Sequence, residues 1–121
     1  MFRTMPTTEQ TAEIARTYFK AWTTADRDGV ANALAEDFVF DSAMITLHGR
    51  QAVLDSQAWP PGATTTIVAE AYQDDHGFQM YDAVNGANTV RVVEHLEVAD
   101  GRLTRSTVVV DAAAFRAFLG M

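Results

Sequence analysis

The sequence predicts an α+β fold, in which N-terminal helices pack on one face of a curved, mostly antiparallel sheet and a short C-terminal helix follows. Two observations lead to this prediction. Apolar residues near the start recur at helical spacing, whereas the chain beyond Gly62 consists of strand-like runs separated by turn signals. The length of 121 residues fits one domain, 1–121, with residues 1–6 as a frayed tail.

The first helix is expected to begin at Thr7 and to end near Thr24. Thr7 can cap it, and Gln10 stands three residues later, where a capping box places its second partner. One apolar face recurs every four residues, at Ile14, Tyr18 and Trp22. Cap and spacing therefore predict the same element.

Two shorter helices and a strand are expected before Gly62. Asp28 can cap a second helix that ends at residues 36–37. Residues 38–41 are aromatic and β-branched, which is typical of a short strand. Residues 51–58 predict a third helix, and the prolines at 60 and 61 end it.

Four strands are expected in the second half of the chain. They cover residues 64–72, 78–84, 89–98 and 103–110. The short Asp-, Asn- and Gly-rich turns between them favour an antiparallel meander, because each strand then returns beside the one before it. Asp111 is expected to cap a last turn or two of helix.

Composition and charge exclude several function classes. Lys and Arg total 9 and Asp and Glu total 16, so the net charge is −7, and nucleic acid and anionic membranes are poor partners. The absence of cysteine excludes disulfides and thiol chemistry. The three histidines are scattered, and we expect neither a metal nor a cofactor. No signal-peptide pattern or long apolar run is present, so we expect a cytoplasmic protein.

The strand at 89–98 carries a carboxylate on its apolar face. The apolar members of this face, by period two, are Val90, Val92, Leu96 and Val98. Glu94 shares the face, and a carboxyl group there is costly unless it is hydrogen-bonded or protonated. Two interpretations stay open: a functional acid whose pKa burial raises, or a structural acid satisfied by a water, a Tyr hydroxyl or the strand end.

The hairpin before this strand decides which side chains accompany Glu94. A two-residue loop at Asn85-Gly86 or Gly86-Ala87 is favoured by the Asn-Gly pair. It places Gln79, Tyr81 and Ala83 on the Glu94 face, and sets Asp82 across from Arg91 on the other face. A three-residue loop inverts this and brings Phe78, Met80 and Asp82 beside Glu94.

Several segments together resemble a known family. They are YFKAW at 18–22, DRDGV at 26–30, LAEDFVF at 34–40, LHGRQAV at 47–53 and the ending at 100–111. The chain resembles the SnoaL-like polyketide cyclase group of the nuclear transport factor 2-like superfamily, to which ketosteroid isomerase and limonene epoxide hydrolase are related. The resemblance implies a cone of three helices around a curved sheet, a deep pocket and commonly a dimer.

The resemblance also implies roles for single residues. Tyr18 matches the oxyanion tyrosine of ketosteroid isomerase. In the oxyanion hole of that enzyme an aspartic acid stays protonated, because its apolar surroundings raise its pKa. Glu94, followed by His95, matches that aspartic acid and its His neighbour. Ser42 stands where the catalytic aspartate is expected, and Asp41 comes one residue earlier, so Asp41 could serve only if the strand bulges or ends there.

An enzyme is the first functional hypothesis. Tyr18 and a protonated Glu94 donate hydrogen bonds to an oxyanion, while Asp41, or a water it orients, moves the proton. The reaction is an isomerisation, cyclisation or dehydration of a hydrophobic, carbonyl-bearing small molecule. The side chains expected to contact this molecule are Trp22, Phe40, Ser42, Met44 and Tyr81.

Two non-catalytic hypotheses remain beside it. The first is a binding domain with the same pocket, which Ser42 at the position of the catalytic aspartate favours. The second is a dimerisation module, for which Val93 on the polar outer face gives some support. In each case the expected partners are a hydrophobic ligand or a second copy that pairs through the outer sheet face.

Overall fold

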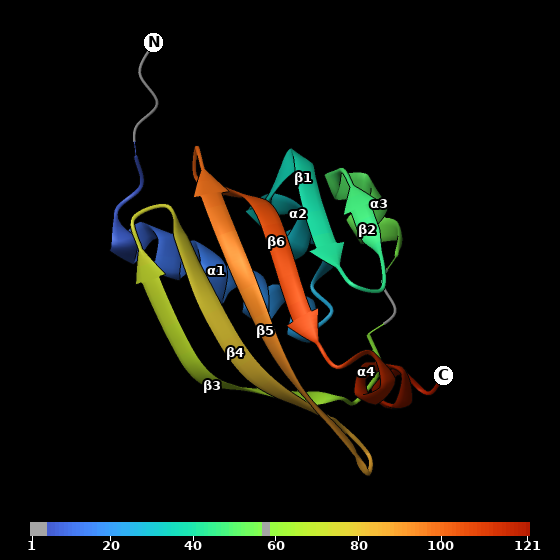
Figure 1. Ribbon diagram of the computed structural model, residues 1–121. Helices are drawn as coiled ribbons and strands as arrows, with labels where there is room; N and C mark the ends of the chain where they lie inside the picture. The colour runs from blue at the N-terminus through green and yellow to red at the C-terminus, as the bar shows by residue number, and fades with distance from the viewer. Residues whose placement is uncertain (1–4, 57–58) are drawn as a thin grey trace.

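One curved six-stranded sheet organises the chain, with helices on one face (Figure 1). The structure is a computed structural model, and it describes residues 5–56 and 59–121. In this part of the chain the strands are β1 (Leu34–Ser42), β2 (Thr46–His48), β3 (Thr64–Gln73), β4 (His76–Asn85), β5 (Asn88–Ala99) and β6 (Arg102–Val110). The helices are α1 (Thr8–Thr23), α2 (Arg27–Ala33), α3 (Arg50–Asp55) and α4 (Ala112–Leu119). The predicted α+β fold is confirmed.

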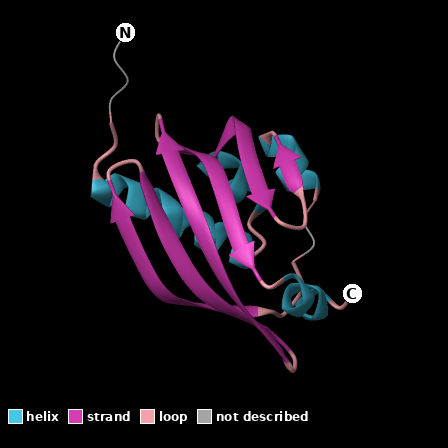
Figure 2. Ribbon diagram, in the orientation of Figure 1, coloured by secondary structure: helices cyan, strands magenta, loops and turns pink. Residues whose placement is uncertain are grey.

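The strand order is β2-β1-β6-β5-β4-β3. Strands β3 to β6 form the predicted antiparallel meander, and β1 joins it by pairing parallel to β6. The longer strands bend along their length, and α1 crosses one face of the sheet while α4 lies at the far end of the meander (Figure 2). This leaves an inner face toward α1 and an outer face without helices.

The capping signals were interpreted correctly for α1 and incorrectly for α2. Thr7 and Gln10 form the predicted capping box at the start of α1. The cap of α2 is Asp26 and not Asp28, because the Asp26 carboxylate accepts from the Gly29 N–H at 3.0 Å. Asp28 lies inside the first turn of α2, where its negative charge interacts favourably with the helix dipole but does not cap the helix.

The end of α2 and the region after it also differ from prediction. The helix ends at Ala33 and β1 begins at Leu34, so residues 36–37 lie in the strand and do not end the helix. Leu34 is fully buried and pairs with Leu103, a tertiary contact that overrides local helical preference. Strand β2 was not predicted, since three residues are too few to show a period. The predicted helix at 51–58 is α3, which ends at Asp55; residues 57 and 58 lie outside the described residues.

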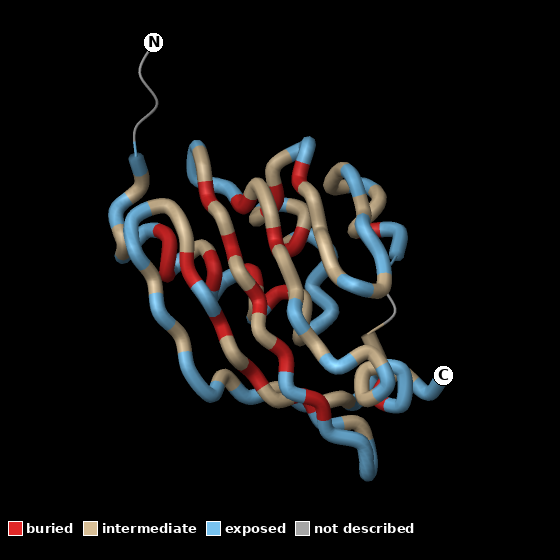
Figure 3. Tube along the Cα trace, in the orientation of Figure 1, coloured by how far each residue is buried: buried red, intermediate tan, exposed pale blue. Residues whose placement is uncertain are grey.

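The β4–β5 hairpin has the favoured two-residue loop. Asn85 pairs with Asn88, which leaves Gly86 and Ala87 as the loop. Buried and less buried residues alternate along both strands (Figure 3), and the buried set includes Gln79, Tyr81, Ala83 and Glu94. On the outer face the Arg91 guanidinium donates to both oxygens of Asp82, at 2.7 and 2.8 Å, as the parity argument predicted.

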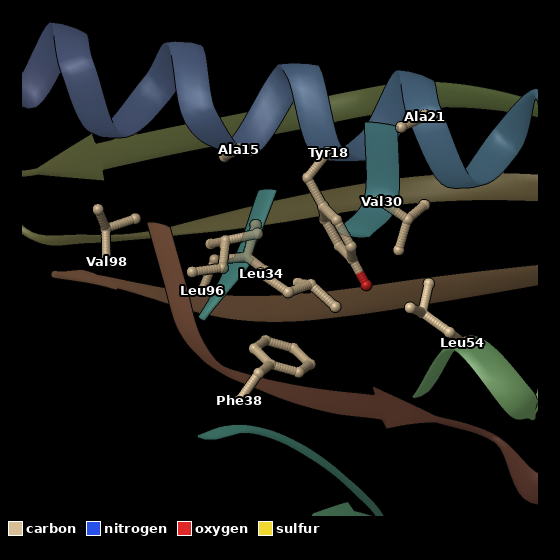
Figure 4. Packing of buried hydrophobic residues seen from close by; sticks show 10 residues of the cluster. Ala15, Tyr18, Ala21, Val30, Leu34, Phe38, Leu54, Leu96 and Val98 are labelled. Carbon is tan, nitrogen blue, oxygen red and sulfur yellow. The ribbon is translucent and has the colours of Figure 1, made fainter. Parts of the chain in front are cut away.

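The inner face holds two packed clusters. The helix-side cluster lies between α1, α2 and the sheet, and Figure 4 shows Tyr18 pointing from α1 into it. Its buried members are Ala15, Tyr18, Ala21, Val30, Leu34, Phe38, Leu54, Leu96, Val98 and Leu103. The second, here called the aromatic cluster, comprises Phe19, Trp22, Trp59, Tyr81 and Phe118. The first two belong to α1, Trp59 precedes β3, Tyr81 lies on β4 and Phe118 lies on α4. Tyr81 and Glu94 therefore stand on the same face as both clusters.

Candidate functional site

Glu94 is buried in the middle of the inner face. Only 2% of the residue is exposed, because β4 and β6 flank it on the sheet and α1 covers the face above. The Ser106 hydroxyl donates to its Oε2 at 2.5 Å, and the Tyr81 hydroxyl donates to its Oε1 at 3.3 Å. The carboxyl group thus has one hydroxyl donor on each neighbouring strand.

Burial and hydrogen bonding act on the pKa of Glu94 in opposite directions. Burial disfavours the charged carboxylate and is the largest effect, so it raises the pKa above the ordinary value of 4.5. The bonds from Ser106 and Tyr81 stabilise the charged form and lower it in part. The net result is a raised pKa, which lies closer to neutral pH than the pKa of an exposed carboxyl group. General acid or base catalysis is most efficient when the pKa of the catalytic group is near the working pH.

Two phenols lie beside this carboxyl group. Burial raises the pKa of Tyr18 well above 10, and the nearby charge of Glu94 raises it further. The same two causes, in the same order, raise the pKa of Tyr81 well above 10. Both residues are no more than 5% exposed. They therefore keep their protons at neutral pH, and the Tyr81 hydroxyl donates to Glu94.

Gln79 and Ser106 belong to this site, although the sequence analysis did not include them among its site residues. Gln79 is directly across from Glu94 on β4, is fully buried, and donates from Nε2 to the Tyr72 hydroxyl at 2.9 Å. Within the described part of the chain, its Oε1 has no hydrogen-bond partner. The hairpin parity had already placed Gln79 on this face. Ser106 carried only a weak signal, its place on the same period-two face of β6 as Val108 and Val110.

The structure separates Asp41 from Glu94. The Arg105 guanidinium donates to Asp41 Oδ2 at 2.9 Å and the Thr46 hydroxyl donates to Oδ1 at 3.0 Å. Residues alternate along β1, and Phe38 and Phe40 face the helix-side cluster, so Asp41 and Arg105 lie on the outer face. The proton-moving role of Asp41 stays a prediction that this geometry does not support.

The five side chains expected to contact a ligand separate into two groups. Trp22 and Tyr81 meet in the aromatic cluster with ring centroids 5.4 Å apart, and Phe40 packs against the helix-side cluster. Ser42 instead makes its hydrogen bonds within the turn before β2, donating to the Ile45 carbonyl at 2.9 Å and accepting from the Met44 N–H at 3.3 Å. The first three therefore line the interior, whereas Ser42 and Met44 hold a turn.

The interior site is closed by side chains. The two hollows described at the surface have volumes of about 360 and 420 Å³ and share Asp100 as a lining residue. Neither is lined by Tyr18, Tyr81 or Glu94. Neither hollow is therefore the deep pocket expected from the sequence at Glu94, and the rings of Phe19 and Trp22 pack against Tyr81 beside this residue.

The described residues offer little for a bound metal. Across 5–56 and 59–121, no three His, Asp or Glu side chains come together in a way that could hold an ion. The same residues include no helix with the length and apolar character needed to cross a membrane.

Comparison with known sequences identifies one family. The profile of the SnoaL-like domain matches residues 15–106, which is more than half of the chain. No curated protein matches the sequence. The profile match includes Tyr18, Glu94 and Ser106.

Solved structures agree on the fold. A ketosteroid isomerase-like protein of Kribbella flavida superposes with a TM-score of 0.80 at 26% identity, covering 86% of this chain and 79% of that one. A SnoaL-like polyketide cyclase-type protein of Jannaschia superposes with a TM-score of 0.82 at 13% identity, covering 98% and 97%. An epoxide hydrolase of M. tuberculosis superposes with a TM-score of 0.74 at 19% identity, covering 93% and 90%. The last two, at this identity, show the shared fold alone.

Proposed function

The chain belongs to the SnoaL-like domain family, and from that premise we propose that it is a cofactor-independent enzyme acting on a carbonyl-bearing, hydrophobic small molecule through an enolate. The observation that supports this most directly is the placement of Glu94: a carboxyl group 2% exposed, with a raised pKa, next to two phenols that keep their protons. Such a set contains both a proton carrier and hydrogen-bond donors.

In this proposal Glu94 moves the proton. Its carboxylate removes a proton from the carbon next to the substrate carbonyl. The electron pair of that C–H bond forms a C=C bond to the carbonyl carbon, and the π pair of the C=O bond moves onto the oxygen. The Tyr18 hydroxyl donates a hydrogen bond to this oxygen as its negative charge develops. Because Asp41 is held by Arg105 on the outer face, Glu94 takes the role that the sequence had assigned to Asp41.

The fate of the enolate sets the reaction type. Return of the proton from Glu94 to another carbon completes an isomerisation. Attack of the enolate on a second carbonyl of the same molecule closes a ring, and the proton then goes to the new alkoxide. Loss of a β-hydroxyl group, protonated by Glu94, releases water and completes a dehydration. All three need one carboxyl group and no metal or redox cofactor.

Exchange of α-protons for deuterium in 2-tetralone, followed by NMR in D2O, tests the first step shared by all three. We expect Glu94→Gln to slow the enzyme-catalysed exchange by about 10²–10⁴-fold, the usual contribution of a general base. Glu97→Gln is the matched control, because Glu97 lies on the same strand with its side chain on the outer face. Exchange that is equally fast in both variants contradicts the proposal, as does a Glu94 carboxyl that titrates like an exposed one.

Non-catalytic binding is the second candidate. It is favoured by Ser42 at the position of the catalytic aspartate and by the bond from Arg105 that holds Asp41 on the outer face, because neither side chain then supplies a base beside Glu94. Here Glu94 and Tyr18 only orient a polar group of the ligand. The two candidates differ in one measurement: a binding domain takes up 2-tetralone, with affinity that Glu94→Gln leaves intact, and never exchanges its α-protons.

The outer sheet face supports a proposal about partners. Phe78 and Val109 are exposed there by 48% and 66%, and Val93 lies between their strands. We therefore propose that two copies pair through this face, as expected from the sequence. Light scattering tests it: Val109→Asp is expected to shift a dimer to a monomer, and a wild-type chain that is monomeric at all concentrations contradicts it. The cytoplasmic location stays a prediction.

A further inference from the structure

Gln79 carries a polar atom in the protein interior that the observed hydrogen bonds leave unsatisfied. The residue is fully buried on β4, and its Nε2 donates to the Tyr72 hydroxyl at 2.9 Å. Among the described residues, nothing donates to its Oε1. A buried carbonyl oxygen without a donor is costly, so its presence calls for an explanation from the groups around it.

Glu94 stands directly across from this amide. The two residues pair in register between β4 and β5, and both are buried on the inner face. Directly opposite residues have Cβ atoms about 4.5–5.5 Å apart, so an amide and a carboxyl group of these lengths are within hydrogen-bond reach. The carboxyl oxygens already accept from Ser106 and Tyr81. An ionised carboxyl group has about four acceptor sites and takes a further donor, whereas a neutral one has a proton to donate.

The amide of Gln79 can bond to Glu94 in either charge state, because it has a donor at one end and an acceptor at the other. In the observed orientation Nε2 bonds to Tyr72, which leaves Oε1 for the proton of a neutral Glu94. A half-turn of the amide exchanges its ends, so that Nε2 donates to an ionised Glu94 and Oε1 accepts from the Tyr72 hydroxyl. Tyr72 suits both orientations, since a hydroxyl group donates as well as accepts.

Glu94 is the group whose charge changes in this set. The phenols that face it are Tyr18 from α1 and Tyr81 from β4; burial, the larger cause, and the charge of Glu94 hold the pKa of each well above 10. Burial also raises the pKa of Tyr72 on β3. From β6 the facing side chain is the uncharged Ser106. The charged side chains beside Tyr72 form an ion pair, Arg16 with Glu70.

We infer that Gln79 is the positioning residue of Glu94, and that its side-chain amide turns over when the carboxyl group gains or loses its proton, with the Tyr72 hydroxyl as partner of the other end. The inference deepens the proposed function, on which its role in catalysis rests. Proton removal from the substrate converts an ionised Glu94 into a neutral one, and Gln79 changes from donor to acceptor at that step. The amide thereby stabilises the base before the step and the acid after it.

Nuclear Overhauser contacts of the Gln79 amide protons test the turn directly. In wild-type protein with labelled glutamine side chains, these protons are expected to contact the Tyr72 ring below the Glu94 titration and the Glu94 side chain above it. The Glu94 carboxyl carbon reports the midpoint of that titration. Glu94→Gln is the control, because its side chain stays uncharged and the contacts of Gln79 are expected to be the same at both pH values. Identical contacts on both sides of the titration in the wild type overturn the inference.

Gln79→Met gives a second measurement of a different kind. Methionine has a similar length and no amide, so the ionised Glu94 loses a donor and the neutral one loses an acceptor. Because hydrogen bonds to charged groups are the stronger, the acid dissociation constant of Glu94 is expected to fall at least about threefold. Gln73→Met is the matched control, since Gln73 is exposed at the end of β3. A constant that rises, or that equals the control, contradicts the inference. The wild-type contacts keep it testable if Gln79→Met does not fold.

Deuterium exchange of 2-tetralone separates this inference from the proposed function. An amide that turns over in a protein that never exchanges the α-protons counts against the enolate chemistry and leaves Gln79 as the partner of Glu94. Exchange by a protein whose Gln79 amide keeps one orientation overturns the inference and leaves the enolate chemistry in place. With both correct, Gln79→Met is expected to move the pH profile of exchange to higher pH together with the Glu94 titration.

Discussion

The bond between Ser106 and Glu94 gives a prediction whose size depends on pH. Ser106→Ala removes the hydroxyl that donates to Glu94 Oε2 at 2.5 Å inside the core. The bond favours the charged carboxylate, so its loss raises the pKa of Glu94 beyond the increase that burial already causes.

The size of the effect follows from the charge of the acceptor. A hydrogen bond to a charged group contributes about 1.5–3 kcal/mol to stability, and one between neutral groups about 0.5–1.5 kcal/mol. Ser106→Ala is therefore expected to lower the free energy of unfolding by the larger amount at high pH, where Glu94 is ionised. At low pH, where Glu94 is protonated, the smaller amount applies. The difference between the two conditions is about 1–1.5 kcal/mol.

Urea unfolding followed by far-UV circular dichroism, at one pH on each side of the Glu94 titration, measures both values. The position of that titration comes from NMR of the Glu94 side-chain carboxyl carbon. Thr107→Val is the control, because it removes a neighbouring hydroxyl of the same strand with its side chain on the outer face. Equal destabilisation by Ser106→Ala at both pH values refutes the reasoning, since the bond would then not distinguish the charged carboxylate from the neutral one.

Three further predictions concern Glu94, Phe38 and the start of α2. The raised pKa of Glu94 means that the folded protein keeps this proton at pH values where the unfolded chain has lost it. The contribution of Glu94 to stability is therefore full below about pH 4.5 and is lost as the pH rises through the folded pKa. Glu94→Gln is expected to flatten this part of a stability–pH curve, and an unchanged curve contradicts the assignment. Phe38→Ala empties the centre of the helix-side cluster and is expected to cost about 3–5 kcal/mol in urea unfolding; a loss below about 1 kcal/mol shows that the site is not closely packed. Asp26→Ala is expected to cost about 0.5–2 kcal/mol through loss of the α2 cap, whereas Asp28→Ala is expected to cost less; the reverse order in thermal unfolding contradicts the cap assignment.

Local chemistry made much of the fold predictable. The capping box at Thr7 depends on residues three apart, and the β4–β5 register depends on a two-residue turn. Both are decided by neighbours in the chain, so the sequence predicts them directly. The same period-two rule placed Glu94 on the buried face before any partner was visible. The α2–β1 boundary was missed because Leu34 joins the sheet through Leu103, which is distant in the sequence.

The candidate site was only half predictable. The sequence by itself put Glu94 on the apolar face of its strand, and the Asn-Gly pair favoured the two-residue loop that adds Tyr81 to this face; the structure then decided between that loop and the three-residue alternative. Only the tertiary structure decided that Ser106 donates to Glu94, that Arg105 holds Asp41 on the outer face, and that the Phe118 ring packs against Trp59. These contacts join residues that lie far apart in the chain. They are fixed by the pairing of β6 with β1 and β5 and by the packing of α4, neither of which leaves a periodic signal in the residues concerned.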